Sequence, residues 1–119
     1  MEFIEEFEKA VSQWEMDTPD ELLFARLQSK VVKALTPPEA FEAIEDVVGT
    51  ISRQSDKYVF YETVITLHAL ARQSDTTEAP SAFLVAVPAL KERCAALDGA
   101  TQNALKELLK YYRLNTIQE

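Results

Sequence analysis

The chain has 119 residues, so we expect one domain, and its formal net charge is −8, from 20 acidic and 12 basic residues. With 47% hydrophobic residues and only two glycines, the composition excludes a collagen-like or low-complexity protein and allows a packed core. One cysteine and one histidine are too few for a Cys/His zinc site. The longest uncharged run, 79–90, is 12 residues long and too short to span a bilayer. The N-terminus lacks the layout of a signal peptide, so we expect a cytoplasmic protein.

The negative charge is concentrated in the first two-fifths of the chain. Residues 1–46 hold 12 acids and 4 bases, whereas residues 47–119 hold eight of each. Such an excess is either a solvated surface or a patch that attracts a basic partner. It disfavours nucleic acid and anionic membranes as partners, because both require a basic surface.

Apolar residues at steps of three and four predict a first helix over 2–16, whose buried face holds Phe3, Phe7, Ala10, Val11 and Trp14. A second helix, 19–35, is predicted to begin at Thr18-Pro19-Asp20-Glu21, which combines an N-cap, a first-turn proline and a capping box. Along this helix runs a basic stripe of Arg26, Lys30 and Lys33.

The same kind of start signal, Thr36-Pro37-Pro38-Glu39, opens a third predicted helix, 37–53. Gly49 lies inside that helix, at a cost of about 1 kcal/mol relative to alanine. A fourth helix is predicted over 57–73 and is apolar on two faces, which is typical of a central helix. The two faces hold Phe60, Val64, Leu67, Leu70 and Ala71, and Tyr58, Tyr61, Ile65, His68 and Ala69.

A fifth helix is predicted over 80–97, with a buried face of Phe83, Val87, Leu90, Cys94 and Leu97. Pro88 lies inside this pattern and either kinks the helix or divides it in two. Asp98-Gly99 is predicted to end it, with Gly99 in the left-handed conformation. The sixth helix is predicted over 100–114, and its buried face holds Leu105, Leu108, Leu109 and Tyr112.

Six helices joined by short loops predict one all-α domain over residues 1–119, in which neighbouring helices are antiparallel. The start signals recur after 18 residues, and the tetrapeptide Arg-Gln-Ser-Asp at 53–56 recurs after 19 at 72–75. A helix pair therefore repeats at about 37 residues, a length typical of αα-solenoids. A helix with an internal proline, as expected around Pro88, resembles the bent first helices of HEAT repeats. The resemblance implies a short HEAT-like αα-superhelix of three hairpins, and a compact six-helix bundle is the alternative.

The sequence holds no motif of a metalloprotease, a phosphate-binding loop or a dinucleotide site, so we expect neither catalysis nor a cofactor. His68 is interpreted as a packing residue and Cys94 as a core thiol. The acids Glu39, Glu42, Glu45 and Asp46 follow one helix surface without opposing carboxylates, so we expect no metal site. They are placed to pair with the basic stripe of the preceding helix.

A second basic stripe, on the last helix, consists of Lys106, Lys110 and Arg113. In a HEAT-like stack both basic stripes lie on the concave face with Tyr61, His68 and Arg72 between them, which is the layout of a nucleic-acid surface. The net charge argues against that interpretation.

In size, acidity and helical content the chain resembles the small immunity proteins that bacteria co-produce with secreted toxins, some of which are HEAT-like. The resemblance implies tight one-to-one binding to a cognate toxin, often a basic nuclease. The net charge of −8 disfavours self-association, so we expect a monomer on its own. We expect the acidic surface and a central aromatic residue to make the contact, through Asp17, Asp20, Glu21, Glu39, Glu42, Asp46 and Tyr61. The alternative is a helical-repeat adaptor that binds a peptide or helix on its concave face.

Overall fold

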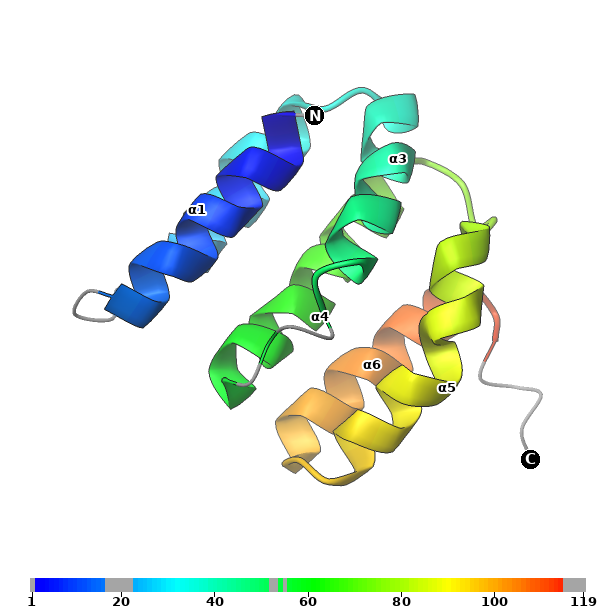
Figure 1. Ribbon diagram of the computed structural model, residues 1–119. Helices are drawn as coiled ribbons and strands as arrows, with labels where there is room; N and C mark the ends of the chain where they lie inside the picture. The colour runs from blue at the N-terminus through cyan, green and yellow to red at the C-terminus, as the bar shows by residue number, and fades with distance from the viewer. Residues whose placement is uncertain (1, 17–22, 52–53, 55, 115–119) are drawn as a thin grey trace.

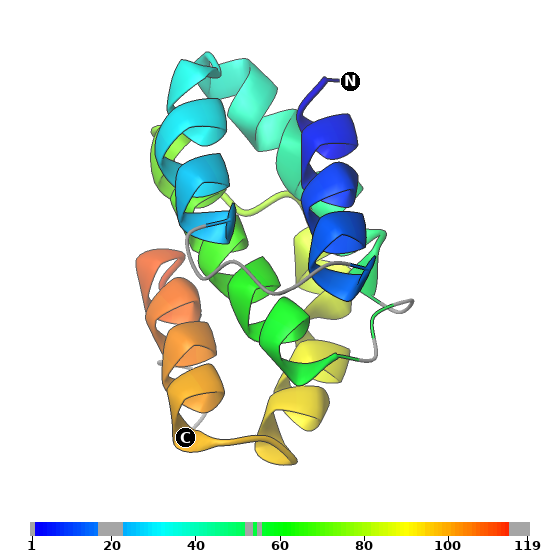
Figure 2. The ribbon, with the colours of Figure 1, turned by 90° about the vertical axis from the view of Figure 1, so that its left-hand side faces the viewer.

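The computed structural model describes residues 2–16, 23–51, 54 and 56–114, and these residues form an all-α fold without strands. The helices lie in two layers (Figure 1), seen from the side in Figure 2. One layer consists of α1 (Glu2–Met16), α3 (Pro37–Val48) and α5 (Ser81–Ala95). The other consists of α2 (Leu23–Arg26) with its continuation, α4 (Lys57–Gln73) and α6 (Gly99–Tyr111). The predicted all-α fold is confirmed.

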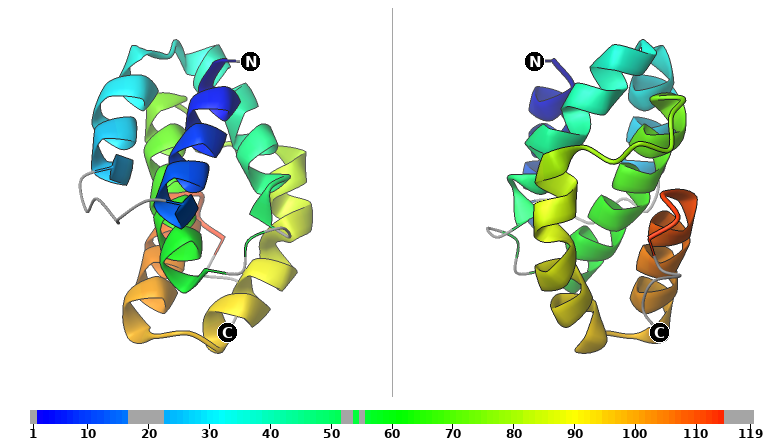
Figure 3. Two further views of the ribbon diagram at one scale, coloured as in Figure 1. Left: turned by 60° about the vertical axis from the view of Figure 1, so that its left-hand side comes forward. Right: turned by 90° about the vertical axis from the view of Figure 1, so that its right-hand side faces the viewer.

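Each helix of the first layer packs against the helical segment that follows it in the chain, and the three hairpins so formed stand side by side (Figure 3). Within the layers, α3 contacts both α1 and α5, and α4 contacts both the second segment and α6. The molecule measures 42 × 33 × 20 Å, and the smallest dimension is about two helix diameters. The pairing and stacking are those expected of a short αα-superhelix.

The second helical segment changes its winding twice. After α2 comes a π-turn, η1 (Leu27–Val31), in which the Val32 N–H donates to the Leu27 carbonyl. A 3-10 turn, η2 (Val32–Ala34), ends the segment. The predicted helix over 19–35 is confirmed in its described part, while Thr18 and the predicted first turn lie outside the described residues. A π-turn holds one extra residue, so the residues after it are rotated by roughly 100° relative to a regular helix.

Side-chain caps fix where the later helices begin. At the start of α3 the Thr36 hydroxyl accepts from the Glu39 N–H at 3.3 Å, and Glu39 accepts from the Thr36 N–H at 2.9 Å, which is the predicted capping box. At the start of α4, Asp56 Oδ1 accepts from the N–H groups of Tyr58 and Val59 at 2.8 and 3.1 Å. These caps explain why both helices begin within one residue of their predicted starts.

Two predicted helix ends are wrong. Gly49 is not inside the third helix but is its C-cap, with φ −64°, so α3 ends at Val48 instead of residue 53. Gly99 has no positive φ. Instead Asp98 caps the start of α6, because its carboxylate accepts from the Thr101 N–H at 3.0 Å and hydroxyl at 2.8 Å. These bonds also lower the pKa of Asp98 below its usual value. Helix α5 has already ended at Ala95.

The repeated tetrapeptide has two different structural roles. Asp56 of the first copy caps the beginning of α4, whereas Asp75 of the second copy follows the end of α4 with φ 58°. Asp is one of the few side chains that adopts this left-handed conformation at low cost. The repeat therefore marks both ends of α4 and is not a structural repeat.

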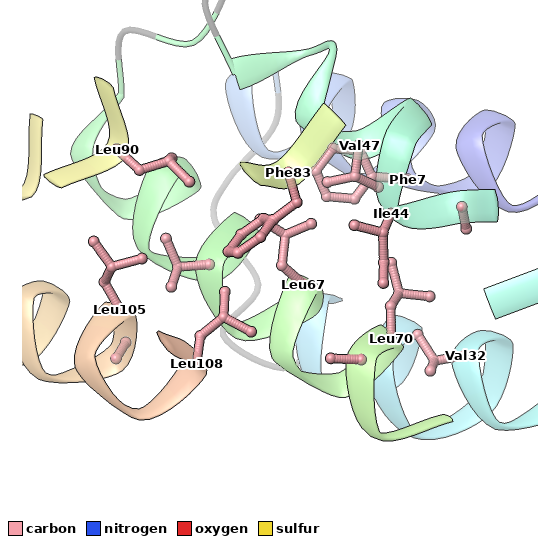
Figure 4. Close-up of a cluster of buried hydrophobic side chains, with 14 of the residues drawn as sticks. Phe7, Val32, Ile44, Val47, Leu67, Leu70, Phe83, Leu90, Leu105 and Leu108 are labelled. Atoms are coloured by element: carbon pink, nitrogen blue, oxygen red, sulfur yellow. The ribbon is translucent and has the colours of Figure 1, made fainter. Parts of the chain in front are cut away.

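The core lies between the two layers and runs the length of the stack. Figure 4 shows Phe7, Ile44 and Phe83 from the first layer packed toward Leu67, Leu70 and Leu108 from the second. Helix α4 is the central element, and its predicted apolar face is buried in full: Phe60, Val64, Leu67, Leu70 and Ala71 are at most 1% exposed. Its second predicted face, which includes Tyr61 and Ile65, is half-buried.

Pro88 lies within a continuous α5, so it does not divide the helix. Around it, α5 turns apolar side chains to solvent: Leu84 is 45% exposed and Val85 is 80% exposed. Helix α5 is the last of its layer, so it has a neighbouring helix of that layer on one side only (Figure 1).

Arg93 connects α5 to both helices of the middle hairpin. Its Nη1 donates to the Ile51 carbonyl at 2.9 Å, and its Nη2 donates to the Gln54 carbonyl. The guanidinium also lies over the ring of Phe60, 4.3 Å from the centroid. Gln54 itself is buried, and its side chain bonds Thr50 and Thr63. One arginine thus satisfies the carbonyls that follow α3 and stacks on the core of α4.

We expect Arg93→Leu to lower the free energy of unfolding by about 2 kcal/mol, since two carbonyls lose a charged donor. Arg93→Lys should recover less than half of this, because an ammonium lacks the planar fork that reaches both carbonyls. Urea denaturation measures the loss, with the exposed Lys91→Leu as the matched control. Equal losses in the Arg93→Leu and Lys91→Leu proteins would contradict the role given to Arg93.

Candidate protein-binding surface

Charge is segregated between the two layers. Within the first layer, α1 and α3 together hold nine acids and one base, and α5 adds one acid and two bases. The second segment, α4 and α6 together hold seven bases and two acids. We define the acidic face as the exposed carboxylates of α1 and α3, namely Glu5, Glu6, Glu8, Glu39, Glu42, Glu45 and Asp46. Among the helices, the net negative charge therefore belongs to the layer of α1 and α3, whereas the other layer is basic.

The acidic face includes a groove where α1, η2 and the start of α3 meet. We call it the acidic groove; it has a volume of about 650 Å³. Carboxylates from two helices line it, Glu5 and Glu6 from α1 and Glu39 from α3. The remainder of its lining is apolar and consists of Phe3, Val31, Ala34 and Leu35. A concave site with an apolar floor and acids around it suits a long side chain that ends in a cation.

Three of the predicted contact residues lie together on α3. Glu39, Glu42 and Asp46 recur at three and four residues, so they form one stripe, and all three side chains are exposed. Asp17, Asp20 and Glu21 lie outside the described residues. Glu5 and Glu6 were not among the predicted contacts, since only the packing of α1 against η1 and α3 brings them to Glu39.

The basic stripe of the second segment does not stay together as the sequence predicts. Arg26 and Lys30 line a groove shared with Glu6 and Lys9 of α1. Lys33 instead lines a groove shared with α4. The π-turn separates them, because its extra residue rotates Lys33 away from the face of Arg26 and Lys30.

Tyr61, the predicted central aromatic residue, lies apart from the acidic groove. It lines a pocket of about 510 Å³ between the first turn of α4 and the loop from α5 to α6, together with Tyr58, Lys57 and Asp98. Tyr58 is held in place by Trp14, whose ring stacks on it at 4.3 Å and whose indole Nε1 is 3.4 Å from Asp56 Oδ2. The aromatic cluster and the acidic groove share no lining residue.

The remaining titratable groups of interest are buried side chains. Burial raises the pKa of the Cys94 thiol, and Arg93 offsets this only in part. The Tyr112 hydroxyl is buried without a hydrogen-bond partner among the described residues, and its pKa is raised by burial and by Tyr111. His68 lies 5.9 Å from the Tyr111 ring. No group of three or more His, Cys, Asp or Glu side chains in the described part of the chain is arranged to hold a metal ion.

Tyr112→Phe should raise the free energy of unfolding by about 1 kcal/mol, because it removes a buried hydroxyl that lacks a partner. Tyr111→Phe is the matched control. The Tyr111 hydroxyl donates to the Thr76 carbonyl at 3.2 Å, so its removal should lower the stability. Chemical denaturation measures the free energy of unfolding of both proteins. A destabilised Tyr112→Phe protein would show that the hydroxyl has a partner in solution.

His68 should make the stability depend on pH just below neutrality. Burial and then Arg72 lower the pKa of His68 from its usual 6.5, against an opposing effect of Glu107. The unfolded chain therefore binds the proton more readily, so stability falls as the pH drops below 6.5 toward the lowered value and is unaffected above it. We expect His68→Gln to make the free energy of unfolding less dependent on pH between 6.5 and the lowered pKa of His68. An unchanged slope would contradict the assignment.

Comparison with protein-family models, with curated proteins and with solved structures found no match to this chain. Among the described helices, none combines the length and apolar character that crossing a membrane requires.

Proposed function

We propose that this protein is a non-catalytic binding module that engages a basic protein through its acidic face. The observation that carries the proposal is the acidic groove, in which Glu5, Glu6 and Glu39 surround an apolar floor. Helix α3 has four acids and no base along its length, so nothing on that helix neutralises the field. A partner with clustered lysines or arginines is the complement of this surface.

The groove accommodates one basic side chain of that partner. Its aliphatic stem would cover Val31 and Leu35, while its charged end would meet the carboxylates of Glu5, Glu6 and Glu39. The rest of the acidic face remains solvated, and exposed charges of this kind contribute more to the association rate and to specificity than to affinity. The partner must therefore supply apolar contacts of its own near the groove.

In its most specific form, the proposal is that the protein is an immunity protein which blocks a basic, nuclease-type toxin in a one-to-one complex. An acidic face occupies the same field that draws phosphate to such a toxin, so binding there would exclude the substrate. A single cysteine that is buried and free suits a reducing cytoplasm. The protein would act there as a monomer without a cofactor.

The first test is to identify the partner, and the second is to reverse the charge of the stripe formed by Glu39, Glu42 and Asp46. A toxin-like domain encoded by the adjacent gene, whose toxicity this chain relieves, is the expected partner. Pull-down from the native host should recover the same protein. If co-expression does not relieve the toxicity of that domain, the immunity function is wrong.

The triple variant Glu39→Lys, Glu42→Lys, Asp46→Lys should slow association with that partner by about 100-fold at low salt, since the steering field is reversed. The wild type should associate more slowly as salt is added, and the triple variant should not. The double variant Glu92→Lys, Glu107→Lys changes exposed acids outside the acidic face and is the control. Stopped-flow kinetics compare the three proteins. Equal rates in all of them would exclude the acidic face as the binding surface.

A further inference from the structure

The opposite layer contains a second groove, between η1–η2 and α4. We call it the basic groove; its volume is about 430 Å³. The half-buried Ile65 and Ala69 supply apolar surface, whereas Val32 is almost fully buried, and Lys33 and Arg72 supply the charge. The rest of the lining is small or polar: Ala25, Gln28, Ser29 and Gln73. No acid is among the described residues that line it.

Two glutamines hold the groove in a fixed shape. On one side, Gln28 of η1 donates through Nε2 to Glu62 Oε1 at 3.1 Å and to Thr66 Oγ1 at 3.0 Å, both on α4. On the other, Gln73 of α4 donates through Nε2 to the carbonyls of Lys33 and Leu35, at 3.3 and 2.7 Å. The two walls are therefore tied together at both ends, and a ligand would meet a site that is already formed.

Within the described part of the chain, the positive charge of the groove is compensated only in part, because the Glu62 carboxylate accepts from the lining Gln28 at one end of the groove. Lys33 and Arg72 are exposed, and neither has an ion-pair partner among the described residues. The layer around them holds seven bases and two acids, so the surrounding field has the same sign. A negatively charged ligand is attracted to this groove, as a positively charged one is attracted to the opposite face.

We propose that the basic groove binds an acidic, amphipathic segment of a partner protein. An aliphatic side chain of the segment lies on Ile65 and Ala69, and a carboxylate pairs with Lys33 and Arg72. The positive charge of the groove favours a ligand with an acidic group, and its apolar floor favours a peptide with an aliphatic side chain. Two cations are too few to follow a nucleic-acid backbone, which needs many phosphate contacts. This inference is independent of the acidic face, because the two grooves share no lining residue.

The test is selection of short random peptides, displayed on phage, against the full chain at physiological salt. We expect enrichment of peptides that combine acidic and aliphatic residues. For a synthetic copy of such a peptide, the double variant Lys33→Glu, Arg72→Glu should raise the Kd by at least about tenfold, since both ion pairs become repulsive. The double variant Lys91→Glu, Lys106→Glu makes the same change of net charge at exposed positions outside the groove and should leave the Kd within about twofold.

A second variant tests the apolar floor. Ala69→Trp fills the groove and should abolish peptide binding in a protein whose circular dichroism is unchanged. Ser12→Trp, at an exposed position on α1, is its control. Chemical shifts in the wild type should move at Ile65 and Ala69 when the peptide is added.

Several results would overturn the proposal. One is the enrichment of no acidic peptide, and another is equal loss of affinity in the groove variant and the charge control. Self-association of the wild type at low salt that Lys33→Glu, Arg72→Glu abolishes would assign the groove to a second copy of this chain. Displacement of the peptide from Lys33 and Arg72 by a single-stranded oligonucleotide at equal concentration would assign it to nucleic acid.

Discussion

The structure depends on the burial of α4. This helix contacts the second segment, α3 and α6, and eight of its 17 residues are buried. Arg93 adds a charged connection from α5, so the middle helix is linked to both of its neighbouring hairpins. A stack only two helices thick cannot cover every side of its central element. What remains of the apolar surface of α4, at Tyr61, Ile65 and Ala69, therefore forms part of a pocket and a groove.

Charge follows the same two-layer geometry. Most exposed acids belong to α1 and α3 and most exposed bases to the other layer of a molecule that is 20 Å thick. Among the described grooves, these two sets of charges meet only where Glu6 shares a groove with Arg26 and Lys30. At physiological ionic strength the Debye length is about 8 Å, so each side presents its own field to an approaching partner. A net charge of −8 suggests a molecule whose whole surface is acidic, whereas the folded molecule has one acidic and one basic side. Two partners of opposite charge are compatible with one small domain for this reason.

Helix positions were predictable because their signals are local. Apolar spacing located each helix, and the capping box at Thr36 fixed the start of α3 to the residue. The errors also have local causes. Asp98 is a helix cap as well as a turn residue, and its pairing with Thr101 decides between the two roles. Gly49 fits a helix interior and a C-cap equally well in sequence terms. The hairpin pairing was accessible only from the short loops and the repeat length, and neither of these carries angles or distances.

The candidate site was harder to predict because it is built between helices. Spacing within α3 placed Glu39, Glu42 and Asp46 on one stripe, but it carries no information on Glu5 and Glu6, which come from another helix. The π-turn is the clearest case. A regular helix keeps Arg26, Lys30 and Lys33 together, and the extra residue of η1 separates Lys33 from the other two. The segment η1–η2 borders both grooves, since Val31, Ala34 and the following Leu35 line the acidic one and Val32 and Lys33 line the basic one. One irregular turn, which no periodicity reveals, thus decides that Lys33 lines the basic groove and not the groove of Arg26 and Lys30.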